Sequence, residues 1–205
     1  METLSAFEKD SLGELLNIAM GTAASKLSEI SNNEVEMSIP DVKLMTHAEY
    51  RNAIEQEKQG TLVRVSESFD GVISGEAVLL FQAGKSMDLV RAIIGDISYA
   101  EDFSELEEEV LTEIGNILLN SCVGTFSNIL QKEFHTEIPE FNKGSIADIF
   151  PELYEEDAEN HYILLAQVAF SSELKELEGE LAVTLTLPAL RTLIKELHLA
   201  FNIAV

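Results

Sequence analysis

Hydrophobic residues recur with a helical period in two long segments of the chain, residues 5–31 and 104–131. In both segments apolar side chains stand three and four positions apart, with polar side chains on the opposite side, which is typical of an amphipathic helix. The first predicted buried stripe comprises Leu12, Leu15, Leu16, Ala19, Met20, Ala23, Leu27 and Ile30. The second comprises Leu111, Ile114, Leu118, Leu119, Cys122, Phe126 and Ile129. We therefore expect two long helices that each bury one face.

Shorter apolar and β-branched runs between these helices predict strands. The predicted strands are residues 34–39, 60–67 and 72–82 in the first half of the chain and residues 133–138, 161–170 and 178–187 in the second. The last two strands of each half are expected to form a hairpin, and the first hairpin is expected to turn at Phe69-Asp70-Gly71. A shorter helix is expected to close each half, at residues 85–94 and 188–199. Pro188 suits the first turn of the second of these helices, where its missing N–H group would have no partner.

An internal repeat organises the chain. When the sequence is shifted by 99 positions, residues 5–40 align with residues 104–139 without gaps. The aligned pairs include Asp10 with Glu109, Glu14 with Glu113, Asn17 with Asn116, Ser28 with Ser127, Glu34 with Glu133, Ile39 with Ile138 and Pro40 with Pro139. After an insertion of five residues, Gly75–Val78 align with Gly179–Ala182.

The repeat predicts an α+β fold in one domain, residues 1–205. We expect a pseudo-twofold tandem repeat of two α-β-β-β-α units, about 1–100 and 101–205. The two units would share one mixed β-sheet backed by helices, with the two long helices on the surface.

The chain is strongly acidic, because 37 Asp and Glu residues face only 13 Lys and Arg residues and give a formal net charge of −24. Such a surface repels nucleic-acid phosphates and anionic lipid heads, and no basic patch offsets it. A partner with a positive rim is favoured, although acidity that only confers solubility explains the charge equally well. With a single cysteine, no basic and apolar leader and no membrane-length apolar run, the sequence predicts a cytoplasmic protein without an internal disulfide.

A ridge of polar side chains follows the outer side of both long helices. It consists of Asp10, Glu14 and Asn17 in the first helix and of Glu109, Glu113, Asn116 and Asn120 in the second. Exposed Glu and Asn on one helix are usually only solvated. However, Asn is a mediocre helix former, and here it stands three residues after a Glu in both copies. Other positions expected to be exposed differ between the copies, for example Lys26 and Thr125, so the shared ridge is a candidate site.

The ridge and the proline that follows it form a spaced motif: an acidic residue or Ser, three residues, Glu, two residues, Asn, twenty-two residues and Pro. It reads Asp10-x3-Glu14-x2-Asn17-x22-Pro40 and, in the second copy, Glu109-x3-Glu113-x2-Asn116-x22-Pro139. This motif resembles the signature of the CheC, CheX and FliY phosphatases of bacterial and archaeal chemotaxis. Two copies in a chain of this length, without an added flagellar-switch domain, are most similar to CheC. Glu109 departs from the Asp or Ser that is usual at the first position.

The resemblance implies hydrolysis of the aspartyl phosphate of a CheY-type response regulator, which supplies its own acceptor aspartate, divalent metal (Mg²⁺) and lysine. Glu14 and Glu113 would pair with that lysine, and Asn17 and Asn116 would hold the attacking water in line. Asp10 and Glu109 would contribute to partner binding, and the chain would need no cofactor or metal of its own. An amide suits this task because it both donates and accepts hydrogen bonds without a charge that would repel phosphate.

Other interpretations of the sequence stay open. The same fold could hold a regulator or a flagellar-switch component without hydrolysing it, or act as a scaffold or metabolite sensor. Some CheC proteins also bind the deamidase CheD, and the matching region here, around Gly144–Tyr154, has only weak helical character. Because two copies already stand in one chain, a monomer is favoured.

Few other residues offer chemistry. The four histidines, His47, His135, His161 and His198, have no metal-ligand spacing, and Cys122 falls on a predicted buried stripe. The acidic stretches 105–109 and 152–159 lack the spacing of a calcium loop, so we expect solvated charge, with the second stretch in an exposed loop.

Overall fold

The computed structural model describes residues 3–31, 34–39, 41–58, 60–95, 103–154, 161–172 and 176–201. The elements are α1 (Ala6–Ser31), β1 (Val35–Ser38), β2 (Val42–Thr46), α2 (His47–Glu57), β3 (Leu62–Gly71), β4 (Gly75–Gln82), α3 (Ala83–Ile94), α4 (Phe103–Leu130), β5 (Phe134–Thr136), β6 (Glu140–Gly144), α5 (Ile146–Ile149), the 3₁₀ helix η1 (Pro151–Tyr154), β7 (His161–Ser172), β8 (Glu176–Thr186) and α6 (Leu187–Ala200). The long helices, the second hairpin and the closing helices lie close to where the sequence predicts them.

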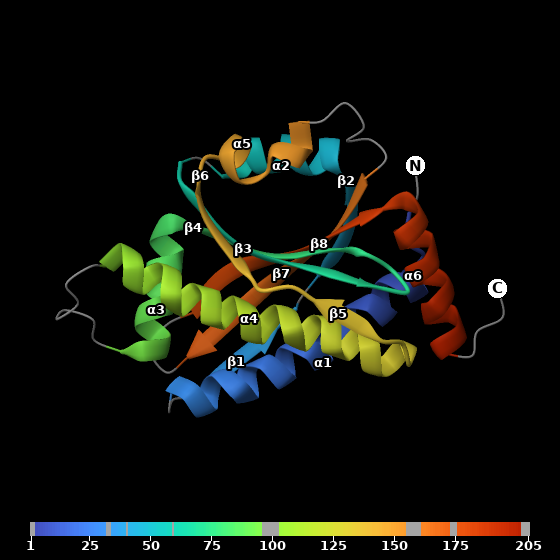
Figure 1. The fold of residues 1–205 in the computed structure, drawn as a ribbon, viewed down its shortest axis with the longest axis horizontal. Helices are drawn as coiled ribbons and strands as arrows, with labels where there is room; N and C mark the ends of the chain where they lie inside the picture. Colours follow the sequence, from blue (N-terminus) through green and yellow to red (C-terminus); the bar gives the residue numbers. More distant parts are fainter. Residues whose placement is uncertain are drawn as a thin grey trace.

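One curled sheet of eight strands forms the centre of the molecule (Figure 1). Its strand order is β1-β7-β8-β4-β3-β5, and β2 pairs with β7 while β6 pairs with β3. Every pairing among the described strands is antiparallel, so the prediction of a mixed sheet is wrong. The two halves of the chain pair with each other at several places in the sheet, because β1 and β2 pair with β7, β3 pairs with β5 and β6, and β4 pairs with β8. The fold is therefore α+β with an antiparallel sheet, and its division into two repeats stays a prediction.

Each half has one strand more than the predicted α-β-β-β-α unit. The segment after Pro40, predicted only to be variable, forms β2 and the helix α2, and the second half has β6, α5 and η1 in the same place. A capping box begins α2, because the Thr46 side chain accepts a bond from the Glu49 N–H group and the Glu49 carboxylate accepts one from the Thr46 N–H group. That Thr-x-x-Glu pattern is readable in the sequence and marks a helix start that the prediction missed.

The first hairpin turns later than predicted. Phe69, Asp70 and Gly71 belong to β3 and pair with β5, so the turn falls at residues 72–74. The prediction of a turn at 69–71 is wrong because β5 offers these residues strand pairing that local sequence does not reveal. A side chain at Gly71 would collide with the backbone carbonyl of Glu133, so the glycine serves close strand approach.

Helices cover both faces of the sheet. In Figure 1, α1 and α4 lie side by side and run in opposite directions across one face, while α2 and α5 lie over the other. The main core joins the buried stripes of α1 and α4 to β-strand side chains, and a second core lies under α2, α5 and η1. The predicted stripes are confirmed except at Ile30, which is 57% exposed, and Ile129, which is only partly buried.

Two acidic side chains that were predicted to be solvated form hydrogen bonds or ion pairs with other side chains instead. Glu107 is buried and accepts bonds from Ser86 Oγ at 2.6 Å and from Lys143 Nζ at 2.5 Å. Glu152 forms an ion pair with Arg64, and its neighbour Leu153 is fully buried. The stretch 152–159 is therefore not an exposed loop at its start, and residues 155–159 lie outside the described part of the chain.

Within the described ranges, no helix is both long enough and apolar enough to cross a membrane.

Candidate functional site

The predicted ridge residues lie on the outer sides of α1 and α4. The carboxylates of Asp10, Glu14, Glu109 and Glu113 are exposed. None of the four forms a hydrogen bond or an ion pair with another described residue. Since neighbouring ridge positions are about one helical turn apart, each helix presents free carboxylates beside a half-buried asparagine.

The amide of Asn17 is held by the backbone of Ile39. Its Oδ1 accepts a hydrogen bond from the Ile39 N–H group at 2.8 Å, and its Nδ2 donates to the Ile39 carbonyl at 3.3 Å and to the Gly13 carbonyl at 3.0 Å. Asn17 therefore ties α1 to the end of β1, with both halves of its amide in use. Its partner in the motif, Pro40, lies outside the described residues.

A small hollow lies beside Asn17, with a volume of about 230 Å³. Its lining residues are Lys9, Asp10, Gly13, Glu14, Asn17, Ile39, Asp41 and Val42. Lys9 forms an ion pair with Asp41 at 2.6 Å and thereby lowers the pKa of that carboxyl. The first motif thus combines a free Glu14 with an asparagine that is already bonded.

Asn116 is placed differently. Its Oδ1 accepts a hydrogen bond from Asn120 Nδ2 at 2.8 Å, which engages the carbonyl side of the amide. Its NH₂ group has no hydrogen-bond partner among the described residues. The second motif therefore presents an unbonded amide donor beside the free carboxylate of Glu113.

The segments that follow the two motif helices account for this difference. Ile39 is 5% exposed and is bonded to Asn17 of α1, whereas the aligned Ile138 is 86% exposed. Next to Ile138, the Glu137 N–H group donates to the Ser68 carbonyl of β3 instead. The backbone that holds the asparagine in the first half is thus absent from the corresponding place in the second.

Behind Asn116 lies a polar network that continues into the core. Asn120 Nδ2 also donates to Glu67 Oε2 at 3.2 Å, and the Thr136 hydroxyl donates to Asn120 Oδ1 at 3.2 Å. Glu67 is 1% exposed, and burial raises the pKa of its carboxyl. Glu67 was not among the predicted site residues. Its signal in the sequence is a charged residue in register with Val63, Val65 and Phe69, which all face the core.

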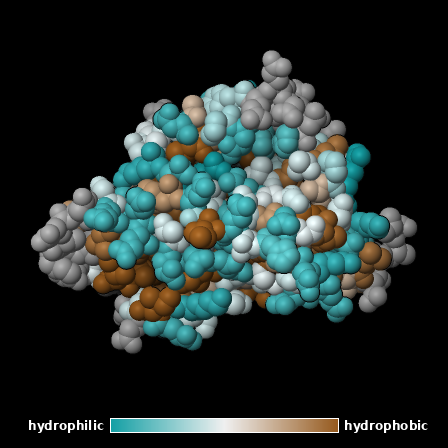
Figure 2. Space-filling view, viewed as in Figure 1, coloured by the Kyte–Doolittle hydropathy of each residue, from teal (hydrophilic) through white to brown (hydrophobic). Residues whose placement is uncertain are grey.

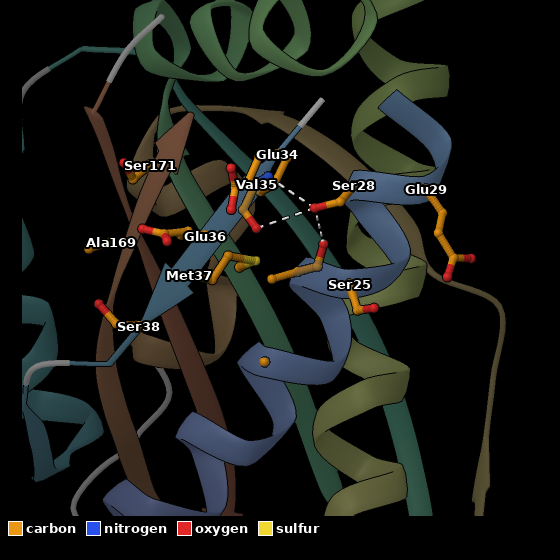
Figure 3. A pocket seen from close by; sticks show the side chains of 12 residues that line it. Ser25, Ser28, Glu29, Glu34, Val35, Glu36, Met37, Ser38, Ala169 and Ser171 are labelled. Carbon is orange, nitrogen blue, oxygen red and sulfur yellow. Dashed lines mark hydrogen bonds between the residues drawn. The ribbon is translucent and has the colours of Figure 1, made fainter. Parts of the chain in front are cut away.

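Two further surface hollows lie beside the motif helices. An apolar cleft of about 320 Å³ runs between α1, α3 and α4 next to Glu109 and Glu113, and Figure 2 shows hydrophobic side chains gathered over that corner. A wider hollow of about 890 Å³ separates α1 from β1, where the Ser28 hydroxyl exchanges hydrogen bonds with the Val35 backbone (Figure 3).

Other chemistry is not assembled in the described part of the chain. No group of three or more His, Cys, Asp or Glu side chains there could hold a metal ion. Cys122 is buried, as predicted, and burial raises the pKa of its thiol to about 12. The His47 and His161 rings contact each other in a tilted arrangement, with 5.2 Å between their centroids.

A family model and several known proteins are similar in sequence to this chain. A family model described as the CheC-like family matches residues 7–44, which contain the whole first motif. The flagellar motor switch phosphatase FliY of Bacillus subtilis (strain 168) is 24% identical over 141 residues, which cover 68% of this chain and 36% of that protein. The CheY-P phosphatase CheC of the same strain is 25% identical over 139 residues, which cover 65% of each.

These similarities support a relationship between this chain and the CheC/CheX/FliY family.

Solved structures support the same fold. The crystal structure of Thermotoga maritima FliY is 21% identical, covers 98% of both chains and superposes with a TM-score of 0.74. The FliM middle domain of H. pylori is 14% identical, covers 94% of this chain and 99% of its own, and superposes with a TM-score of 0.66. This chain therefore shares its fold with FliY and with the FliM middle domain. The matched relatives are longer than the part this chain spans, since it covers about a third of FliY and just under two thirds of CheC.

Proposed function

We propose that this chain dephosphorylates a phosphorylated CheY-type response regulator in chemotaxis. The observation that carries the proposal is the second motif, where the free carboxylate of Glu113 stands about one turn from the unbonded NH₂ group of Asn116. These are the two groups that the family mechanism requires, and neither has to break a protein contact to meet a partner. The shared fold and the similarity to the CheC/CheX/FliY family also support the proposal.

In this mechanism the regulator docks its active site on α4. Glu113 pairs with the regulator's lysine, a charge-assisted contact that fixes the register of the complex, while Glu109 at the helix start adds attraction for cationic side chains. Asn116 enters the regulator's site and holds a water in line with the phosphorus. The water oxygen bonds to phosphorus as the bond to the aspartate oxygen breaks, the aspartate carboxylate leaves, and the water's proton passes to a phosphate oxygen or to solvent.

The chain itself supplies only positioning in this scheme. An acyl phosphate is already reactive, and the regulator's Mg²⁺ neutralises phosphate charge, so orienting the water is the remaining task. The chain needs no cofactor of its own. Its net charge of −24 favours encounter with a regulator surface rich in Lys and Arg, and we place the activity in the cytoplasm.

The first motif is proposed as a second docking place with the same roles for Asp10, Glu14 and Asn17. Since Asn17 is bonded to Ile39, this motif must release its amide before it can hold a water. That observation also favours a second candidate function for this end of the molecule, namely binding of the regulator without hydrolysis. The pseudo-twofold repeat, a monomeric chain and an interaction with CheD belong to the same proposal.

The experiment is the decay of phosphorylated regulator in the presence of the wild type, the Asn17→Ala, Asn116→Ala double variant and a matched control, Asn128→Ala. Asn128 is an exposed asparagine on the same helix as Asn116 but outside the ridge. The proposal expects accelerated decay by the wild type and the control and loss of acceleration in the double variant.

Binding of a beryllofluoride-activated regulator is measured in parallel. If the wild type binds the activated regulator but does not accelerate decay, the chain is a binding module and not a phosphatase. Full acceleration by the double variant would show that both asparagines are the wrong residues.

A further inference from the structure

We propose that Asn120 and Glu67 are positioning residues that hold the amide of Asn116 with its NH₂ group outward, and that the second motif alone has this support. The inference rests on the proposed function and names residues that lie outside the motif. Neither residue touches the regulator in this scheme, so both act through Asn116.

The hydrogen bonds determine which way each amide faces. A Glu67 oxygen at 3.2 Å accepts a bond, so the nitrogen of Asn120 must face it, and the Thr136 hydroxyl donates to the opposite, carbonyl side of Asn120. The second N–H of Asn120 then points to Asn116 at 2.8 Å and requires an oxygen there. Asn116 consequently turns its Oδ1 inward and its NH₂ group outward, where a donor can meet a water or a phosphoryl oxygen.

Glu67 is costly to keep in this place. It is 1% exposed, lies on the core side of β3, and its Oε1 has no hydrogen-bond partner among the described residues. Burying a carboxyl with an unsatisfied oxygen destabilises the folded state, and nearby residues of β3 on the same side are Val65 and Phe69. Stability alone would favour an apolar residue at position 67, so its bond to Asn120 is the function that the geometry offers.

The first half of the chain shows the same positions without the network. The 99-residue shift aligns Asn120 with Gly21. Met37 pairs with Phe170 and the aligned Thr136 with Phe69, so Glu67, two residues before Phe69, corresponds to the buried Val168.

With Gly21 and Val168 in these places, the first half lacks counterparts of the Asn120 amide and the Glu67 carboxyl, and the Asn17 carbonyl bonds to Ile39 instead. Gly21 lines the open hollow drawn in Figure 3, and a Cβ atom added at Gly21 would meet no atom within 4 Å outside its own helix backbone. This hollow thus lies at the position in the first half that corresponds to Asn120 in the second.

The test measures kcat and KM for regulator dephosphorylation in an Asn17→Ala background, so that the measured activity comes from the second motif alone. Asn120→Ala is expected to lower kcat about fivefold or more, the factor that one net hydrogen bond is worth, with KM within about twofold of the background. Glu67→Val, which copies the residue at position 168, is expected to act in the same way. Glu67→Gln keeps an accepting oxygen for Asn120 and is expected to retain kcat.

The controls separate this inference from the proposed function. Gly21→Ala in the same background is expected to change neither constant. Asn116→Ala must abolish turnover, and if it does not, the proposed function fails before the positioning inference is reached. If Asn116→Ala is inactive while Asn120→Ala keeps full kcat, or if Glu67→Gln falls as far as Glu67→Val, the positioning role is overturned. Should Glu67→Val not fold, the half-buried Asn120 still provides the decisive variant.

Discussion

Replacing Asn17 or Asn116 with alanine is expected to affect turnover and stability in opposite order. For Asn17 to reach a bound regulator, two hydrogen bonds to Ile39 must break, and each neutral bond contributes roughly 0.5–1.5 kcal/mol net. The released amide is then disfavoured by about 1–3 kcal/mol, which lowers its population about 5-fold to 150-fold. Asn116 carries no such penalty, because its NH₂ group is already unbonded.

Asn17→Ala should therefore remove only a minor share of wild-type turnover, whereas Asn116→Ala should remove most of it. Stability should respond the other way. Without Asn17, the buried N–H group of Ile39 loses its partner at a cost of about 1–3 kcal/mol, and a chain of this size loses about 2–4 °C in Tm for each kcal/mol. Asn116→Ala removes one acceptor from Asn120, which still donates to Glu67, so its Tm should fall less.

Single-turnover decay of phosphorylated regulator and thermal unfolding, measured on the same protein samples, check both orders. Equal losses of turnover in the two variants would mean that the bonds to Ile39 do not close the first motif. An unchanged Tm for Asn17→Ala would mean that these bonds do not hold the end of β1 in solution.

Three further outcomes follow from packing and burial. Gly115→Ala is expected to destabilise the fold by about 1–3 kcal/mol in denaturant unfolding, because the added methyl would collide with the Val65 side chain of β3, while an unchanged midpoint would contradict this contact. Cys122 is expected to resist a thiol reagent at neutral pH until the protein unfolds, since burial raises its pKa to about 12, and rapid native labelling would refute its burial. Burial raises the Glu67 pKa above its ordinary value of 4.5. As pH rises past 4.5, the folded state therefore keeps a proton on Glu67 that the unfolded state has lost. The stability that Glu67 contributes below pH 4.5 is lost over this range. Glu67→Gln should accordingly gain Tm relative to wild type between acid and neutral pH, and parallel Tm curves would exclude this linkage.

Periodicity predicted the long helices well because each has an uninterrupted buried stripe. Leu12 to Leu27 in α1 and Leu111 to Phe126 in α4 bury as the helical period requires. The same reasoning failed at Ile30 because the last turn of α1 extends past the sheet onto the rim of the apolar cleft, where its side chain stays exposed.

Strand pairing was the harder part to predict. Gly71 resembles a turn residue locally, but β5, more than sixty positions later, pairs with it and extends β3. The segment containing β2 and α2 was overlooked although Thr46 and Glu49 form a readable capping box. Local sequence carries start signals for helices more directly than it carries the partners of strands.

The candidate site, like the fold, could be predicted from the sequence only in part. Glu14, Asn17, Glu113 and Asn116 could be selected from spacing and repetition, because helical neighbours are fixed by sequence separation. The bonds of Asn17 to Ile39 and of Asn120 to Glu67 depend on how other elements pack against the helices, and they place the asparagines of the two similar motifs in different environments. A repeated motif therefore identified the surface but not the state of each asparagine.

The opposite directions of α1 and α4 affect how many regulators one chain can bind and how many active centres a kinetic assay detects. Leu27 and Ile30, late in α1, line the cleft beside Glu109 and Glu113, early in α4, so the two motifs lie toward opposite ends of the helix pair. Two regulators could then occupy one chain without competing. A binding titration would give a stoichiometry of two, while the burst of phosphate from a single turnover would count one fast centre. The slow end would act as a reservoir that holds phosphorylated regulator and delays its loss when the regulator is scarce.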